Sequence, residues 1–287
     1  MTITTPRDEL DHRIERFQRH LTTAGLDGAL ILQNTDLFYL AGTVQQAHLY
    51  VPAAGDPVLM VRKSLARARA ESALDAIVAL KSPRQIADIL QAHGHTPPQR
   101  LGMELDVIPA ALYLQYTRLF ADAALIDISP GLRQVRAVKS GYELDLMRAA
   151  ARQADAVADS VRTIIREGMT EVELAGRVEA EARRRGHQGI VRMRMFGGEL
   201  FYGHLLAGPP AAVPSYLASP TGGTGVSPAV AQGAGFDRIR PGEPILLDYV
   251  FAWQGYIADH TRIFALGELP ADDRLQFQHG LVGLQKI

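Results

Sequence analysis

Hydrophobic positions in the first part of the chain alternate between helical spacing and strand spacing. Apolar residues three or four apart predict an amphipathic helix that ends near Gly25: Leu10, Ile14, Phe17 and Leu21. Continuous or alternating apolar runs predict strands in GALILQN, AHLYVPAAGDPVLMVRK (two strands around a turn), RLGMEL and AALIDIS. Further helices are predicted in RQIADILQAHG and IPAALYLQYTRLF. This alternation predicts an α/β domain over residues 1–134.

The pattern changes after residue 134, so we expect a second domain over residues 135–287. It begins with an expected linker, SPGLRQVRAVKSGYE, and a long amphipathic helix whose apolar stripe is Leu144, Met147, Ala151, Ala154, Val157, Val161 and Ile164. Ser140 with Glu143, and Thr170 with Glu173, fit the capping-box pattern at the starts of this helix and the next one. From Gly186 onward, glycine, proline and strand-forming residues predict a sheet, so the second domain is α+β.

The segment ILLDYVFAWQGYIADHTRIF places two aspartates on either side of a turn. With strands over 243–251 and 255–264 and a turn centred between Trp253 and Gln254, Asp248 lies directly opposite Asp259, their Cβ atoms roughly 5 Å apart. Two carboxylates this close repel each other and need a shared proton, a basic partner or a metal ion. The alternative is an exposed hairpin with two solvated aspartates near Arg262. Strand alternation directs His260 to the other face.

Composition narrows the range of functions. The chain has 30 Lys and Arg against 31 Asp and Glu, which gives no electrostatic footprint for nucleic acid or an anionic membrane. The absence of cysteine excludes disulfides, thiolate metal sites and cysteine nucleophiles. No apolar run is long enough to span a bilayer and the start lacks a signal-peptide pattern, so we expect a soluble cytoplasmic protein. The glycine-rich stretch 219–235 lacks the context of a phosphate-binding loop and is expected to be an ordinary loop.

The aspartate hairpin resembles the metal-binding hairpin of the creatinase/prolidase/aminopeptidase P family, the M24 "pita-bread" metallopeptidases. The matching residues are Asp248, Gly255, Tyr256, Asp259, Thr261, Arg262 and Gly267. The stretch GLDGALILQNTDLFYLAGT is similar to the creatinase-like N-terminal domain of that family, and VRAVKSGYELDLMRAAARQADAV and IIREGMTEVELAGRVEAEARRRG resemble its first two catalytic-domain helices. The resemblance implies an α/β creatinase-like domain followed by an α+β pita-bread domain, incomplete here.

The same resemblance implies a site chemistry. Two divalent metal ions, manganese or cobalt with zinc as a third candidate, would activate water, with Asp248 bound to one metal and Asp259 bridging both. The implied substrates are peptides with proline in the second position, and the implied assembly is a homodimer. The family also has a substrate-facing histidine ahead of the first aspartate; Ser215 falls where that residue is expected, and His204 is the candidate to replace it as a catalytic residue.

The sequence departs from the family pattern at its end. The family completes its metal site with a histidine and two glutamates from a later part of the domain, and the chain stops before those positions, in a helix expected from near Asp272 to Ile287. Two alternatives therefore stay open beside the metallopeptidase: a catalytically inactive pita-bread binding module, and a metal-independent C–N hydrolase of the creatinase type.

Overall fold

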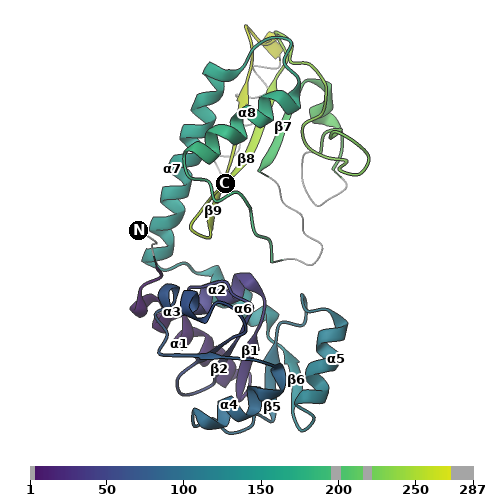
Figure 1. The fold of residues 1–287 in the computed structure, drawn as a ribbon. Coiled ribbons are helices and arrows are strands. Elements are labelled where there is room, and N and C mark those ends of the chain that lie inside the picture. Colours follow the sequence, from purple (N-terminus) through teal and green to yellow (C-terminus); the bar gives the residue numbers. More distant parts are fainter. Residues whose placement is uncertain (1–3, 195–201, 216–221, 273–287) are drawn as a thin grey trace. The chain divides into compact units, whose positions relative to one another are not determined.

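The computed structural model describes residues 4–194, 202–215 and 222–272, which form two compact units (Figure 1). The N-terminal unit comprises Met1–Tyr142 with Arg192–Glu199, and the C-terminal unit comprises Glu143–Val191 with Leu200–Ile287. The helix expected from Asp272 onward lies almost entirely outside the described residues. In the described part, no helix combines the length and the apolar character needed to cross a membrane.

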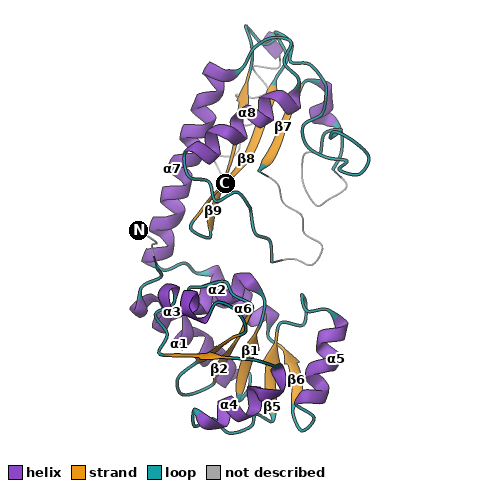
Figure 2. Ribbon diagram, in the orientation of Figure 1, coloured by secondary structure: helices purple, strands orange, loops and turns teal. Residues whose placement is uncertain are grey.

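The N-terminal unit is built on a six-stranded mixed sheet with strand order β4-β3-β2-β1-β5-β6 (Figure 2). Its strands are β1 (Gly28–Ile31), β2 (Ala47–Pro52), β3 (Val58–Val61), β4 (Ala76–Ala79), β5 (Arg100–Met103) and β6 (Ala124–Asp127). The pairs β1–β2 and β2–β3 are antiparallel, whereas β1–β5, β5–β6 and β3–β4 are parallel. The carboxyl ends of β1, β5 and β6 consequently meet at one edge of the sheet.

Helices cover both faces of this sheet. They are α1 (Arg7–Thr23), α2 (Asn34–Ala41), α3 (Leu65–Glu71), α4 (Ile86–Ala92), α5 (Ala110–Leu119) and α6 (Ser129–Ala137), with a short 3-10 turn at Pro83–Gln85. One core contains Phe17 of α1, Leu37 of α2 and Leu132 of α6, while the core on the other face contains Leu90 of α4 and Tyr116 of α5. The predicted α/β architecture is confirmed, and all four apolar residues that define the stripe of α1 are buried.

The expected linker after β6 is wrong, because its first nine residues form helix α6. Pro130 and Gly131 are typical of a linker, but proline is tolerated in the first turn of a helix, where its missing N–H would have no partner. Gly131 is explained by packing, since a Cβ at this position would collide with the ring of His20. The buried side chains of Leu132 and Val135 hold α6 against the sheet.

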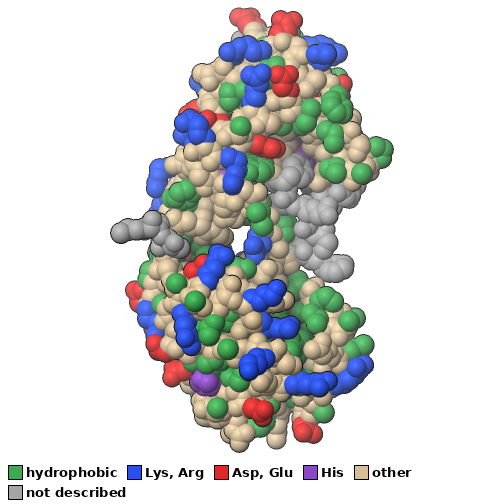
Figure 3. Space-filling view, viewed as in Figure 1, with side chains coloured by type: hydrophobic (Ala, Val, Ile, Leu, Met, Phe, Trp, Pro, Cys, Tyr) green, Lys and Arg blue, Asp and Glu red, His purple; other side chains and the backbone are tan. Residues whose placement is uncertain are grey.

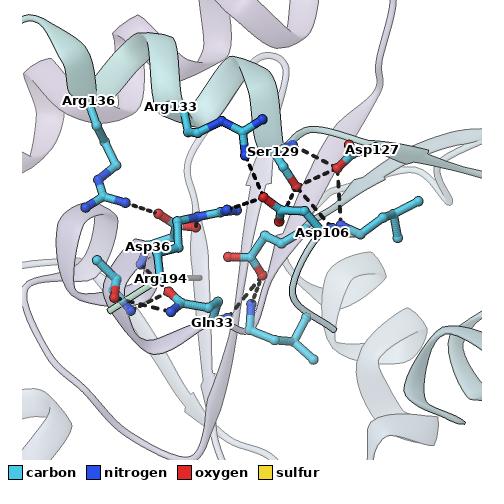
Figure 4. A network of polar contacts seen from close by, with 12 residues as sticks. Gln33, Asp36, Asp106, Asp127, Ser129, Arg133, Arg136 and Arg194 are labelled. Atoms are coloured by element: carbon cyan, nitrogen blue, oxygen red, sulfur yellow. Dashed lines mark hydrogen bonds and ion pairs between the residues drawn. The ribbon is translucent and has the colours of Figure 1, made fainter. Parts of the chain in front are cut away.

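A buried ion-pair network joins the carboxyl ends of β1, β5 and β6 (Figure 4). Asp36 is fully buried and accepts hydrogen bonds from Arg136 Nη1 at 2.8 Å and from Arg194 Nε at 2.6 Å. Arg194 Nη1 also contacts Asp106 Oδ2 at 2.5 Å, and Arg133 Nη1 contacts the same oxygen at 2.6 Å. The network therefore ties Arg194 to α2, to α6 and to the end of β5 within the N-terminal unit.

Glu104 is a second fully buried carboxyl beside this network. Its Oε2 accepts hydrogen bonds from the amides of Leu32 and Gln33, whereas its Oε1 has no donor. Burial, with the Asp36 charge as the next cause, raises the pKa of Glu104 to about 8. A raised pKa favours the protonated form of Glu104 beside the Asp36 carboxylate.

The C-terminal unit packs two helices on one face of a three-stranded antiparallel sheet (Figure 1). Its elements are α7 (Gly141–Ile164), α8 (Glu171–Arg184), β7 (Gly203–Ala207), a 3-10 turn at Pro209–Ala212, β8 (Ile245–Trp253) and β9 (Tyr256–Phe264), with strand order β7-β8-β9. Alternate residues of β8 are buried against the helices: Ile245, Leu247, Tyr249 and Phe251. The intervening residues, which include Asp248, face the opposite side.

Thr170 caps α8 as predicted, since its Oγ1 accepts a hydrogen bond from the amide of Glu173 at 3.2 Å. The stripe predicted for α7 is confirmed in its later part, where Ala154, Val157 and Val161 are buried. Leu144 is 39% exposed, however, and does not belong to the core. The helix is therefore packed along only part of its length in the C-terminal unit.

The hairpin turn corrects the predicted register. Gln254 and Gly255 have φ values of 50° and 84°, and positive φ at both central residues is the type I′ geometry preferred in two-residue hairpins. The turn is thus centred between these two residues, and Trp253 pairs with Tyr256. Asp248 pairs with Thr261, and Asp259 pairs with Val250. The predicted direct opposition of the aspartates is wrong, but they share a face, because a shift of two residues preserves the alternation.

The turn geometry predicts the effect of two glycine substitutions. Gly255→Ala should lower the free energy of unfolding by about 1 kcal/mol, because a Cβ disfavours the left-handed region. Gly176→Ala in the interior of α8 should raise it by up to about 1 kcal/mol, since alanine favours helix and this position has open space around it. Urea unfolding of both variants tests whether the first substitution lowers and the second raises the free energy of unfolding. A stabilising Gly255→Ala would contradict the turn assignment.

The buried Glu104 predicts a pH dependence of stability. Its folded pKa of about 8 lies above its usual value of 4.5, so between these values the folded chain keeps a proton that the unfolded chain has released. Rising pH therefore removes stability across this window. Glu104→Gln keeps a hydrogen-bond donor near Asp36 but does not titrate. The unfolding free energy of this variant minus that of the native chain should therefore increase from about pH 5 to about pH 9, by up to several kcal/mol.

The matched control is Glu15→Gln, which changes an exposed glutamate of α1 in the same unit. Urea unfolding at several pH values should give a constant offset for this control. A constant offset for Glu104→Gln as well would show that Glu104 is ionised in the folded chain.

Candidate functional site

Three polar side chains form a row across the C-terminal sheet. His204 of β7 pairs with Asp248 of β8, and Asp248 pairs with Thr261 of β9. Directly paired residues of antiparallel strands project on the same face. Thr261 Oγ1 donates a hydrogen bond to Asp248 Oδ1 at 2.7 Å, which fixes one oxygen of that carboxylate. The row lies on the face of the sheet opposite to α7 and α8.

Asp259 lies beside this row, one pleat from Asp248 on the same face. It pairs with Val250, so the two carboxylates are diagonal neighbours across β8 and β9. Burial raises the pKa of Asp259, the charge of Asp248 raises it further, and His260 opposes both effects. Among the described residues, no Lys or Arg forms an ion pair with Asp248 or Asp259. Within the described ranges, the two carboxylates are therefore neighbours without a basic side chain to neutralise them.

His204 is the histidine that the sheet places next to the aspartates. Its side chain is buried, and burial lowers its pKa, against the opposing effect of Asp248. An imidazole with a lowered pKa is neutral at pH 7 and retains a nitrogen lone pair for a proton or a cation. The sequence singled out His204 from its position in the chain alone, and the register supplies the reason, a direct pairing with Asp248.

The other face of the hairpin binds helix α7. His260 Nδ1 lies 3.0 Å from Asp155 Oδ1, and Arg262 Nη2 lies 2.8 Å from the same oxygen. The predicted orientation of His260 away from the aspartates is therefore confirmed. Arg262 is bound to Asp155 on this opposite face, so it is not the basic neighbour of the aspartates that the alternative of an exposed hairpin included.

Glu171 organises the surroundings of the row and was not recognised from the sequence. Its Oε1 accepts a hydrogen bond from the amide of Ala207 at 2.6 Å, and its Oε2 accepts one from the amide of Gly235 at 2.8 Å. This buried carboxyl therefore joins the end of β7 to the glycine-rich stretch. The only sequence signal was its place directly after the capping residue Thr170. Ser215, by contrast, lies in the irregular segment after the 3-10 turn and belongs to no strand.

The row offers donors that suit a divalent cation. Carboxylate oxygens and a neutral imidazole are ligands for metals such as manganese, cobalt and zinc. Within the described ranges, the structure contains no cluster of three or more His, Asp or Glu side chains arranged to hold a metal ion. Asp248, Asp259 and His204 together therefore make up a partial donor set.

Comparison with family models divides the chain in the same way as its folding units. Residues 13–138 match the creatinase/prolidase N-terminal domain, and residues 145–282 match metallopeptidase family M24. A curated relative, the uncharacterized peptidase YqhT of Bacillus subtilis, is 23% identical over 265 residues, which cover 91% of this chain and 66% of the relative. The chain spans about two thirds of the length of the curated relatives it matches.

Solved structures share the fold of this chain. An Xaa-Pro dipeptidase from Bacillus anthracis superposes with a TM-score of 0.76 at 22% identity, covering 92% of this chain and 67% of that one. A dipeptidase from Pyrococcus horikoshii OT3 gives a TM-score of 0.67 at 28% identity over 92% of this chain and 67% of its own. The expected fold, a creatinase-like domain followed by a pita-bread domain, is confirmed. The two family matches together account for most of the chain, which belongs to the creatinase/prolidase-type M24 metallopeptidases.

Proposed function

We propose that this chain contributes to a metal-dependent peptidase that hydrolyses peptides with proline in the second position. The observation that carries the proposal is the row on the face of the C-terminal sheet opposite to α7 and α8. Asp248, Asp259 and His204 project together there, and among the described residues no Lys or Arg pairs with either aspartate. Membership of the M24 family and the likeness to an Xaa-Pro dipeptidase support the reaction class.

Asp248 and Asp259 are the proposed metal ligands. Burial and, next, the charge of Asp248 raise the pKa of Asp259, and a divalent cation held by the two carboxylates would offset their repulsion. Thr261 orients Asp248 by its hydrogen bond, so one carboxylate oxygen stays directed along the row. The chemistry that bound divalent ions supply in such a site is Lewis-acid polarisation of the scissile carbonyl and a water nucleophile at neutral pH.

His204 is the proposed catalytic residue on the substrate side. Burial keeps its imidazole neutral, which suits it to hold a proton at the substrate or to accept one from it. Its direct pairing with Asp248 supports this assignment, because the two side chains project on the same face of the sheet. The assignment separates an acid–base group from the carboxylates that bind the cation.

Further parts of the proposal rest on the family resemblance. The metal is manganese or cobalt, with zinc as the third candidate, and the protein forms a homodimer. The proposed cytoplasmic location rests on the sequence pattern instead. Metal analysis of the protein isolated from its natural source, with its intact mass and its mass in solution by light scattering, tests the metal and the assembly. The intact mass, compared with the 31.3 kDa of these 287 residues, also shows which length of chain is present when activity is measured.

Substitution of the two aspartates tests the metal assignment. Asp248→Asn and Asp259→Asn should each weaken manganese binding at least about tenfold, since even partners outside the ligand shell contribute that much. Both should abolish cleavage of a dipeptide with proline second. The matched control is Asp145→Asn, which removes an exposed aspartate of α7 that pairs with Arg148.

The outcomes separate the competing functions. Retained turnover in Asp248→Asn would overturn the metallopeptidase assignment and favour a metal-independent C–N hydrolase. No manganese binding and no turnover in the native protein would favour an inactive binding module. Equal losses in the Asp145→Asn control would show that the effect is one of general charge.

His204→Gln tests the acid–base assignment. The glutamine cannot titrate near neutral pH, so kcat should fall about 10²–10⁴-fold while manganese affinity stays within about twofold. The measurement is steady-state kinetics on the same dipeptide together with a manganese titration. A loss of manganese affinity as large as that of Asp248→Asn would reassign His204 as a metal ligand.

A further inference from the structure

A hollow of about 320 Å³ lies at the carboxyl ends of the parallel strands β3 and β4 in the N-terminal unit. Nine residues line it, and none of them is acidic: Gln46, Val61, Arg62, Lys63, Ser64, Leu65, Ala79, Leu80 and Lys81. In open α/β sheets, ligands bind in the crevice outside the carboxyl ends of the strands. This hollow is separate from the row of His204, Asp248 and Asp259, which belongs to the other folding unit.

Three cations converge on the hollow. Arg62 and Lys63 are the first two residues after β3, and Lys81 is the second residue after β4. None of the three forms an ion pair with another described residue, whereas most arginines of α1, α3 and α6 do. Three like charges around one hollow repel each other, and an anion bound among them relieves that repulsion. The balanced charge of the chain makes this local excess distinctive.

Lys and Arg side chains lie in the middle of the face of the N-terminal unit that Figure 3 shows, and Asp and Glu lie nearer the edges of that face. The charge of Arg62 also affects a buried side chain, His48. Burial is the larger cause, but the charge of Arg62 adds to it in lowering the pKa of the buried His48 to about 4.

Ser64 gives the hollow its backbone donors. It adopts φ 57° and ψ 49°, a left-handed conformation that is uncommon for a residue with a side chain and that concentrates at ligand-binding and other functional sites. In the part of the chain that the structure describes, neither the Ser64 hydroxyl nor the amides of Lys63 and Ser64 donate a hydrogen bond. A left-handed residue in a turn creates the concave amide arrangement in which anions bind.

We propose that this hollow is a binding site for a small phosphate-bearing ligand, a phosphomonoester or a diphosphate, held by Arg62, Lys63, Lys81 and the hydroxyl and amide of Ser64. These donors, three of which are cationic, favour phosphate over a carboxylate, because phosphate offers three or more acceptor oxygens. The volume admits a small molecule rather than a folded partner. The site is independent of the proposed peptidase activity.

Calorimetric titration of the whole chain with inorganic pyrophosphate tests the proposal. We expect saturable binding with one site, and a loss of about tenfold or more in affinity for each of Lys63→Ala and Lys81→Ala, since a charge-assisted hydrogen bond contributes that much. Lys139→Ala is the matched control, because Lys139 is an exposed lysine of the same unit whose ammonium contacts the carbonyl groups of Arg136 and Ala137. It should bind pyrophosphate like the native chain.

Parallel titrations identify the source of the anion. Acetate should bind at least about tenfold more weakly than pyrophosphate, given the difference in acceptor oxygens. Phosphatidylcholine vesicles containing phosphatidate should not retain the protein. Vesicle binding without pyrophosphate binding would overturn the proposal in favour of a membrane contact. Absence of saturable pyrophosphate binding, or an equal loss in Lys139→Ala, would overturn it outright.

Discussion

The burial of one face of strand β8 is the constraint on which the candidate site depends. Four of its alternate side chains, Ile245, Leu247, Tyr249 and Phe251, pack against α7 and α8, and each such burial contributes about 1.5–3 kcal/mol. A shift of the β8 register by one residue would expose these four side chains and direct Asp248 into the core. That penalty greatly exceeds the repulsion between two partly exposed carboxylates. The core therefore forces Asp248 and Asp259 onto the opposite face together.

The two folding units accommodate paired carboxyl groups in different ways. Glu104 and Asp36 are fully buried, so one keeps its proton and the other is neutralised by Arg136 and Arg194. That arrangement pairs the buried carboxylate with arginine side chains and holds the ends of β1 and β5. Asp248 and Asp259 have solvent access, and among the described residues no arginine pairs with them. A carboxyl pair without a bound arginine keeps its oxygens available, whereas the buried pair of the N-terminal unit does not.

The errors of sequence reasoning came from positions where local signals conflicted with tertiary packing. Pro130 and Gly131 suggested a linker, but the proline fits the first turn of α6 and the glycine accommodates the ring of His20, which lies far away in sequence. In the hairpin, the turn was placed one residue too early, and this moved the partner of Asp248 by two positions. The positive φ values of Gln254 and Gly255 fix the true centre, and only a three-dimensional structure gives them.

The sequence by itself determined the architecture and the two aspartates. Apolar spacing defined α1 and the later part of α7, and the Asp248, Gly255, Tyr256 and Asp259 pattern carried the family resemblance. Only the tertiary structure decided which side chains meet those aspartates. His204 is opposite Asp248 because β7 is the third strand of the sheet, and Arg262 is excluded because Asp155 of α7 binds it. Such contacts join residues distant in sequence, and periodicity carries information only about neighbours along one element.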